Sequence, residues 1–342
     1  MAKGRVTILD VSREAGVSRS TVSLVLRGEG SISAATQQRV WDVIQRIGYV
    51  YHRGAASLRD TQSKILGVIV PDFANSTFGE IAAGVETVSQ SQGYVQFMAQ
   101  AGDDPDRQAK IIAAMGEYGI AGLVVAPAIG TTPDQLRVLD RFGIPVVQVG
   151  RRLDDETLNR VVSDDRTGIQ LAVHHLYAHG HRDIAFLGGD ENTVAHRVRA
   201  SVFAETIQGL GLPICDPPAI TSKPSAAGGL EALRQLDQSG RRPTAIVCFN
   251  DAVALGVYEG LRDSGREPGV DVSVVGFDDA PEAAHTFPKL TTISVDPRDL
   301  GRHAATLIIN LVRGAVTAPQ HITCPVHLVV RDSVRPVTPP AA

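Results

Sequence analysis

Residues 6–27 read VTILDVSREAGVSRSTVSLVLR and contain two short helical patterns separated by one glycine. Thr7 is a favoured capping residue, and the acid three positions later, Asp10, completes the pattern of a helix start. Gly16 ends this first helix, and Ser18 can cap a second one. Two short helices joined by a tight turn predict a helix-turn-helix unit.

A third helical pattern extends from Ser33 to Gly48. Apolar residues in all three patterns recur at the three- and four-residue spacing of one buried helix face. These residues are Val11, Ala15, Val22, Val25, Leu26, Val40, Ile44 and Ile47. We therefore expect residues 1–50 to form a three-helix headpiece with a small core of its own.

The exposed side of the second predicted helix carries side chains that suit DNA. In a helix-turn-helix, the first residues of the second helix enter the major groove. There Arg19 can donate two hydrogen bonds to guanine O6 and N7, and Leu24 can contact a thymine methyl group. The headpiece residues expected to contact DNA are Thr7, Ser18, Arg19, Ser20, Thr21, Ser23, Leu24 and Ser33.

Residues 51–63 predict a hinge between the headpiece and the rest of the chain. Gly54 makes this stretch a poor helix by itself, while Ala55 and Ala56 would let two copies pack closely. We expect the hinge to fold into a helix when a dimer sits on DNA. Leu58 would then enter the minor groove as an apolar wedge, with Ala55 at the same surface.

The charge of the chain is unevenly distributed. The 342 residues carry a formal net charge of −4, with 43% apolar and 20% charged residues, which is the composition of an ordinary globular protein. Residues 1–60 contain nine Lys/Arg against five Asp/Glu, a net charge of +4, which leaves −8 for the remainder. This asymmetry indicates a small module for polyanions on an acidic body.

The remainder alternates apolar runs of strand length with amphipathic helices, which predicts α/β architecture with doubly wound parallel sheets. Strands are expected at 65–70, 94–99, 122–126, 146–149, 181–187, 244–249 and 272–277. Nearly all of them read as too apolar to face water. Helices are expected at 79–92, 107–118, 133–142, 168–178, 196–209, 226–238 and 252–264. About 280 residues exceed one such sheet, so we expect two.

The sequence resembles the LacI/GalR family of bacterial transcriptional regulators. The motifs that carry the resemblance are Val6-Thr-Ile-Leu-Asp-Val, Ala15-Gly-Val-Ser, Ser20-Thr-Val-Ser, Ser33 with Thr36, Gly48-Tyr49, and Ala55-Ala-Ser-Leu58. The resemblance implies a sequence-specific repressor whose affinity for a pseudo-palindromic operator is controlled by a small polar effector, such as a sugar. Leu24 and Tyr51 depart from common family residues, so the operator sequence does not carry over.

The resemblance also implies that residues 64–342 form an effector-binding core similar to periplasmic sugar-binding proteins. In that arrangement the chain crosses three times between an N-lobe and a C-lobe. We place the N-lobe at about 64–162 and 292–323, and the C-lobe at about 163–291 and 324–342. The effector would lie between the lobes, at the carboxyl ends of strands, where open α/β sheets bind ligands.

Polar residues that follow apolar strands are the candidates for this cleft. Carboxylates, amides and guanidinium groups together suit a polyhydroxylated or otherwise polar ligand. The family motif indicates Asp164, Arg199, Asn250 and Asp278 in one lobe, opposite Asp72, Phe73, Asn75 and Phe78 in the other. Asn250 also reads as an ordinary helix cap. Val202 and Pro224 depart from sugar-responsive members, so a pyranose stacked in the familiar way is not implied.

Two other protein classes can share an α/β core, a cytoplasmic solute-binding protein and a nucleotide-dependent enzyme. The basic headpiece argues against the first. The glycine pairs at 188–189 and 228–229 match neither GxGxxG nor a P-loop, and no GxSxG motif occurs. His175 and His179 have the spacing of metal ligands on a helix, but no HExxH glutamate accompanies them. We expect no catalytic residue, cofactor or metal.

The remaining features concern location and assembly. The three cysteines are far apart and odd in number, which favours a reducing compartment. No signal-like apolar segment follows the N-terminus, and no apolar run approaches the ~18 residues of a membrane span. We expect a cytoplasmic protein without membrane contact. The Pro-rich end of the sequence leaves no room for a C-terminal heptad helix, so we expect a homodimer.

Overall fold

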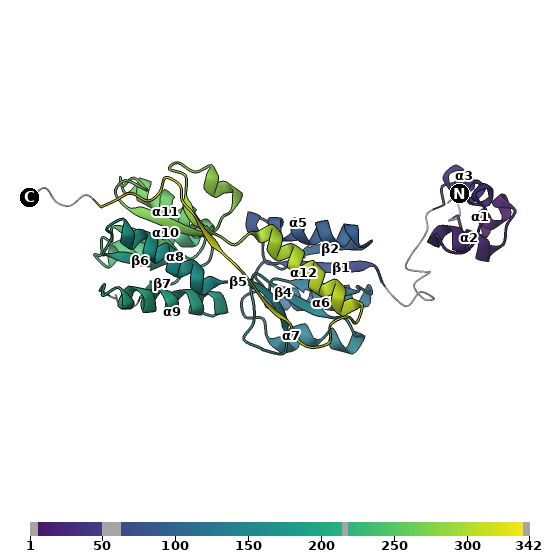
Figure 1. Cartoon of the computed structure of the whole chain (residues 1–342), viewed down its shortest axis with the longest axis horizontal. Helices are drawn as coiled ribbons and strands as arrows, with labels where there is room; N and C mark the ends of the chain where they lie inside the picture. Colours follow the sequence, from purple (N-terminus) through teal and green to yellow (C-terminus); the bar gives the residue numbers. More distant parts are fainter. Residues whose placement is uncertain (1–5, 50–62, 214–217, 338–342) are drawn as a thin grey trace, which may run out of the picture. The chain divides into compact units, whose positions relative to one another are not determined.

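The computed structural model describes residues 6–49, 63–213 and 218–337, and the chain divides into two compact units (Figure 1). The first unit is Met1–Ser63, here called the headpiece unit, and the second is Lys64–Ala342, here called the core. Nearly all of the predicted hinge, including Ala55 and Leu58, lies outside the described residues.

The headpiece unit contains the three helices that its sequence predicts. They are α1 (Ile8–Ala15), α2 (Arg19–Arg27) and α3 (Ala34–Ile47). Thr7 and Asp10 form a capping box at α1, and the Ser18 Oγ accepts a hydrogen bond from the Thr21 amide at 3.0 Å. Gly16 ends α1 in the left-handed conformation, with φ of 64°. The helix-turn-helix prediction is confirmed.

The core contains two six-stranded sheets, each in its own lobe. The sheet of the first lobe has the order β11-β5-β4-β3-β1-β2, and all its neighbouring strands are parallel. Its strands are β1 (Ile65–Val70), β2 (Val95–Gln100), β3 (Gly122–Val125), β4 (Val146–Val149), β5 (Asn159–Ser163) and β11 (His321–Cys324). Its helices are α5 (Ser76–Ser91), α6 (Pro105–Glu117), α7 (Pro133–Arg137) and α12 (Pro297–Val312).

The sheet of the second lobe has the order β12-β10-β9-β8-β6-β7, and only β12 runs antiparallel to its neighbour. Its strands are β6 (Ile184–Leu187), β7 (Ala219–Ile220), β8 (Ala245–Cys248), β9 (Ser273–Asp278), β10 (Thr291–Ser294) and β12 (His327–Val329). Its helices are α8 (Asp165–Ala178), α9 (Val194–Gly209), α10 (Ala226–Gln238) and α11 (Asp251–Asp263). Two doubly wound sheets confirm the predicted fold class.

The chain passes between the sheets three times, after β5, after β10 and between β11 and β12. The second passage follows Ser294, a few residues after the expected lobe boundary at about 291–292, because β10 pairs with β9 in the second sheet, where Ser294 lies opposite Asp278. The sequence did not predict β5, β7, β10, β11 or β12 as strands, or α12 as a helix. These strands are short and most of them contain polar residues, so the hydrophobic pattern alone does not reveal them.

β2 is an exception to the expectation that nearly all of the predicted strands are buried. The exposed fractions of its Val95, Phe97 and Met98 are 51%, 46% and 45%. The reason is its position at the edge of the first sheet, where it pairs only with β1. Apolar composition therefore did not distinguish an edge strand from a central one.

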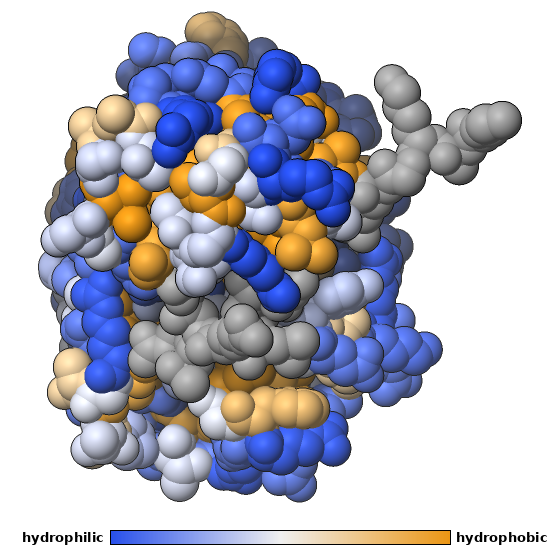
Figure 2. All heavy atoms as spheres, turned by 90° about the vertical axis from the view of Figure 1, so that its right-hand side faces the viewer, coloured by the Kyte–Doolittle hydropathy of each residue, from blue (hydrophilic) through white to orange (hydrophobic). Residues whose placement is uncertain are grey.

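On the face drawn in Figure 2, hydrophilic residues predominate and hydrophobic ones appear between them. None of the described helices is long and apolar enough to span a bilayer.

Candidate functional site

The headpiece offers an exposed polar surface at the start of α2. Arg19 and Ser20 are exposed, and Arg19 forms no hydrogen bond or ion pair with the described residues. Its guanidinium group is therefore available to an external acceptor. Thr21, Ser23 and Leu24 are half-buried on the same helix.

Three of the predicted DNA contacts also have local structural roles. The hydroxyl oxygens of Thr7, Ser18 and Ser33 take part in the caps of α1, α2 and α3. All three residues remain exposed. A hydroxyl group has two acceptor sites and one donor, so a capping role leaves capacity for a phosphate.

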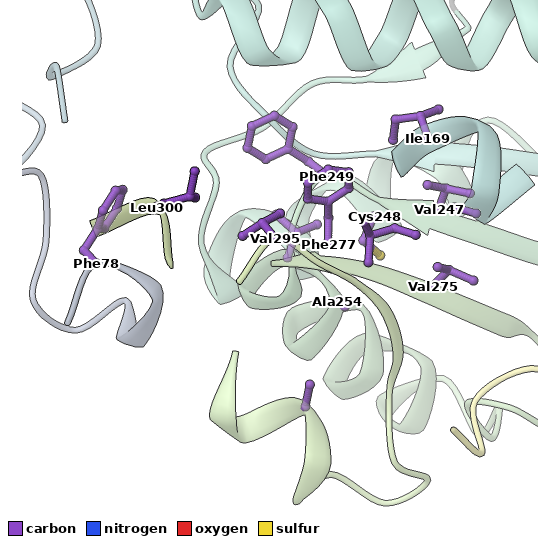
Figure 3. Packing of buried hydrophobic residues seen from close by; sticks show 14 of the residues in the cluster. Phe78, Ile169, Val247, Cys248, Phe249, Ala254, Val275, Phe277, Val295 and Leu300 are labelled. Carbon is purple, nitrogen blue, oxygen red and sulfur yellow. The ribbon is translucent and has the colours of Figure 1, made fainter. Parts of the chain in front are cut away.

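The core contains a cavity of about 60 Å³ between its lobes, here called the interlobe cavity. Five of the eight residues predicted for the cleft line it, namely Asn75 and Phe78 of the first lobe and Arg199, Asn250 and Asp278 of the second. Its apolar lining includes Phe78 and Leu300 of the first lobe and Phe249 and Val295 of the second. Figure 3 shows these side chains within the buried hydrophobic cluster, with Phe78 and Leu300 on one side and Phe249 and Val295 on the other. The cavity thus combines an apolar wall with polar side chains, as ligand sites commonly do.

Arg199 is held rigidly in the wall of the interlobe cavity. Its Nε and Nη2 donate to Asp165 Oδ1 at 3.0 and 2.8 Å, and its Nη1 donates to the Phe249 carbonyl at 2.6 Å. The guanidinium carbon lies 3.6 Å from the centroid of the Phe277 ring. These contacts orient the group while leaving it N–H donors for a ligand.

Asp278 ends β9 in an unusual conformation and faces the first lobe. Its φ is 115°, which a non-glycine residue rarely adopts, so the loop must hold the carboxylate in place. Burial raises the pKa of Asp278 to about 6, although the Arg199 guanidinium acts in the opposite direction. Its Oδ2 accepts a 3.5 Å hydrogen bond from Thr77 Oγ1 across the cavity.

The raised pKa of Asp278 predicts that the difference in stability between the wild type and an Asp278→Asn variant depends on pH. The folded protein binds this proton up to about pH 6 and the unfolded chain only up to about 3.8, so stability falls as pH rises between these values. Asp278→Asn removes the buried charge. We expect its apparent unfolding temperature to exceed that of the wild type by about 3 °C at pH 7.5, with a much smaller difference at pH 4.

Thermal unfolding between pH 4 and 7.5 measures this difference. Asp263→Asn is a matched control, because Asp263 is exposed and has no hydrogen bond or ion pair with the described residues. A difference that stays constant with pH would show that Asp278 does not titrate between the two states.

Asp251 supports the loop that carries Asp278. Its Oδ2 accepts from the Ala280 amide at 2.8 Å, and its Oδ1 accepts from Thr292 Oγ1 at 2.6 Å. Burial raises the pKa of Asp251 well above its usual range, and the neighbouring Asp278 charge adds to this effect. Asp251 thus positions the cavity wall without lining it.

Three of the predicted cleft residues do not reach the interlobe cavity. Asp164 caps α8, where it accepts from the Thr167 amide at 3.0 Å and the Thr167 hydroxyl at 2.7 Å. Asp72 accepts from the Ala74 amide at 2.9 Å, and Phe73 is exposed. Both carboxylates are used locally, Asp164 in a helix cap and Asp72 in a turn, and a polar residue after a strand can serve these roles as well as ligand binding.

Asn75 and Asn250 line the cavity while their Oδ1 atoms cap α5 and α11. Each side-chain amide therefore keeps its NH₂ group for a ligand. The two interpretations of Asn250 as a cap and as a cleft residue are compatible.

Sequence reasoning missed several polar residues of this site, among them Thr77, Arg151, Asp165 and Asp190. Arg151 follows β4 in the same way that the predicted residues follow their strands, so this signal was present. The sequence could not show which of the two neighbours, Asp164 or Asp165, belongs to the site. That depends on which of their carboxylates the first turn of α8 directs toward Arg199.

The histidine cluster on α8 does not form a metal site among the described residues. The rings of His175 and His179 lie 4.3 Å apart, and the His179 Nδ1 contacts the His175 carbonyl at 2.8 Å. The described part of the chain contains no group of three His, Cys, Asp or Glu side chains that could hold an ion.

Comparisons with known proteins agree with this geometry. Residues 7–51 match the family of bacterial regulatory proteins called the lacI family, and residues 173–334 match a periplasmic binding protein-like domain. The maltose regulon regulatory protein MalI of Escherichia coli K12 is 32% identical over 95% of this chain and 98% of its own length.

Solved structures are similar along almost the whole chain. A Lac repressor dimer bound to operator and the anti-inducer ONPF has a TM-score of 0.85 at 27% identity, covering 97% of this chain and 99% of its own. A complex of the transcriptional regulator CelR with cellobiose has a TM-score of 0.74 at 27% identity, covering 96% and 100%. These matches confirm the resemblance and the two-lobed core. The chain belongs to the lacI family of bacterial regulatory proteins.

Proposed function

We propose that this DNA-binding regulator represses transcription as a homodimer on a pseudo-palindromic operator, and that a small polar effector in the interlobe cavity controls its operator affinity. The observation that carries the proposal is the cavity itself, which brings Arg199 and Asp278 of one lobe opposite Thr77 and Phe78 of the other. A single ligand there contacts both lobes, so it favours one lobe arrangement over others.

The lobes already contact each other beside this cavity. Ser76 Oγ donates to Glu282 Oε2 at 2.6 Å, and Thr77 Oγ1 donates to Asp278 at 3.5 Å. A ligand that replaces or strengthens these contacts changes the relative free energies of the lobe arrangements. Operator DNA must then change the effector affinity by the same factor, because the two binding equilibria are linked.

The relatives support a sugar or a related polar metabolite as effector, since MalI is named for the maltose regulon and CelR was solved with cellobiose. The polar set of Asn75, Asn250, Asp278 and Arg199 suits hydroxyl groups. We propose that the protein is not an enzyme and uses no cofactor. We place the protein in the cytoplasm, where its DNA would lie.

The edge strand β2 is the surface that we propose to face the second protomer. Val95, Phe97 and Met98 expose apolar side chains there, and a bare apolar edge is otherwise an aggregation hazard. The Lac repressor relative was solved as a dimer. Two headpieces related by a two-fold axis would read two half-sites, which gives the operator its pseudo-palindromic symmetry.

Arg19→Ala tests the DNA-binding part of the proposal. An operator is first selected from a pool of randomised duplexes, and its affinity is then compared with that for random DNA. We expect about a tenfold to hundredfold loss at the operator, because a bidentate arginine–guanine contact contributes ~1–3 kcal/mol of discrimination. The loss on random DNA should be much smaller.

Arg39→Ala is the matched control, because Arg39 is also exposed on the headpiece and lies on α3. It removes the same charge without touching the start of α2. Equal losses on operator and random DNA in Arg19→Ala would reassign Arg19 to a phosphate contact. No selectable operator at all would contradict the proposed function.

A further inference from the structure

A second cavity of about 230 Å³ adjoins the interlobe cavity, and we call it the outer cavity. Arg151, Thr193 and Ala195 line both. The interlobe cavity of about 60 Å³ has room for only a few water molecules. Ligand pockets usually measure ~300 Å³ or more, so a metabolite in this lobe arrangement would need both spaces.

The outer cavity is lined by three arginines and one acidic residue, Arg151, Arg152, Arg197 and Asp154. Arg151 is already neutralised, since its Nη1 lies 2.5 Å from Asp103 Oδ1 and its Nη2 lies 3.2 Å from Oδ2. The other two guanidinium groups therefore have to share Asp154.

Asp154 is a weak partner for both. Its oxygens lie 3.9 Å from Arg152 and 3.8 Å from Arg197, beyond hydrogen-bond distance, and its side chain is 76% exposed. The Arg152 side chain is only 25% exposed and donates no hydrogen bond within the described part of the chain. The Arg197 side chain is 49% exposed, and its Nη1 donates one hydrogen bond, to the Asn192 carbonyl at 3.3 Å. The outer cavity thus holds an excess positive charge, with unused N–H donors on both arginines and a partly buried guanidinium group on Arg152.

The backbone adds to this positive environment. α9 begins at Val194, and the amides of Val194 and Ala195 in its first turn have no acceptor among the described residues. The N-terminal end of a helix carries a partial positive charge. This partial charge acts in the same direction as the full charges of the Arg152 and Arg197 side chains.

The interlobe cavity has the opposite character. Its Arg199 is paired with Asp165, while Asp190 and Asp278 add carboxylates to its lining. One end of the combined space therefore suits hydroxyl groups, and the other end suits an anion.

We propose that the effector is a polyhydroxylated compound with an anionic group, a phosphate or a carboxylate, and that Arg152 and Arg197 bind this group in the outer cavity. The proposal rests on the proposed function of the interlobe cavity and names the chemical class of its ligand. Guanidinium groups bind both anions through paired N–H donors, so the two share one recognition chemistry.

Inorganic phosphate is the first probe, titrated into the full chain by calorimetry at constant ionic strength. We expect saturable binding whose dissociation constant rises at least tenfold in Arg152→Gln/Arg197→Gln. Arg234→Gln is the control, because Arg234 is exposed on α10 and has no partner among the described residues. No saturable binding, or binding that survives the double variant, overturns the anion site.

Operator affinity provides the second readout and distinguishes the two anions. Neutral sugars are compared with their aldonates and their phosphates, for example glucose with gluconate and glucose 6-phosphate. We expect only the anionic compounds to change operator affinity. If the aldonates do so, the anionic group is a carboxylate, and if the sugar phosphates do so, it is a phosphate. Neutral sugars that act equally well in the double variant overturn the anion proposal and leave the proposed function standing. If phosphate binds at Arg152 but no ligand changes operator affinity, the proposed function fails and the anion site stands.

Discussion

Arg199→Ala is expected to abolish the response to effector while leaving operator binding intact. The guanidinium group is buried, stacks on Phe277 and donates three hydrogen bonds within the cavity wall. Its removal takes the charge-assisted donors from the ligand and leaves Asp165 without its partner. We expect the effector affinity to fall by about a hundredfold or more, since each such contact contributes ~1.5–3 kcal/mol.

A thermal-shift screen identifies an effector for this measurement. A ligand at ~100 times its dissociation constant adds roughly 2.7 kcal/mol to the stability of the protein that binds it. The same ligand should produce no shift with Arg199→Ala, and it should leave the operator affinity of this variant unchanged.

Two further variants separate ligand binding from stability. Arg199→Lys keeps the charge but not the planar fork, so it should retain a weakened response. Arg182→Ala removes an arginine that donates to the carbonyls of Tyr177 and His181, outside the residues that line the cavity. A normal effector response in Arg199→Ala would remove Arg199 from the site.

Gly84→Ala is expected to destabilise the core strongly. α5 and α12 pack side by side in the first lobe (Figure 1), and a Cβ on Gly84 would lie 2.0 Å from the Arg298 carbonyl oxygen. Gly301 is equally constrained, because its Cβ would lie 2.0 Å from the Ile81 carbonyl oxygen. A backbone oxygen cannot move without its helix, so one methyl group must push the helices apart. We expect a loss of about 3 kcal/mol.

Gly79→Ala in the same helix should have the opposite effect. A Cβ on Gly79 would meet nothing within 4 Å, and alanine is the better helix former by ~0.5–1 kcal/mol. Thermal unfolding of the two variants therefore compares the same substitution at two positions of one helix, where the expected changes in stability have opposite signs. Equal behaviour would mean that α5 and α12 are not packed as closely as the structure shows.

Short-range patterns allowed the headpiece to be predicted almost completely. The capping pair of Thr7 and Asp10, the glycine at position 16 and the Ser18 cap act over three or four residues. Such interactions can be predicted from residues that are close together in the sequence. The alternation of strands and helices likewise predicted doubly wound parallel sheets, because the hydrophobic period depends on local spacing, and the length of the core predicted two of them.

The cleft was only partly predictable. Polar residues at strand ends indicated Asp278 and Asn250, but the same signal indicated Asp72 and Asp164, which the structure uses in a turn and in a helix cap. A carboxylate after a strand can serve either role, and its neighbours in sequence do not decide between them. Arg151 and Asp165 required knowledge of what lies opposite them in space.

Residues that are close in sequence thus account for the helices, the caps, the strand periodicity and the basic headpiece, because each depends on neighbours within a few positions. The interlobe cavity depends on contacts such as Thr77 with Asp278 and Ser76 with Glu282, which are separated by 201 and 206 positions. Their geometry follows only from how both sheets pack and where the chain crosses between them. The exposure of β2, the glycine contact of α5 with α12 and the arginine-lined outer cavity were decided by the same long-range packing.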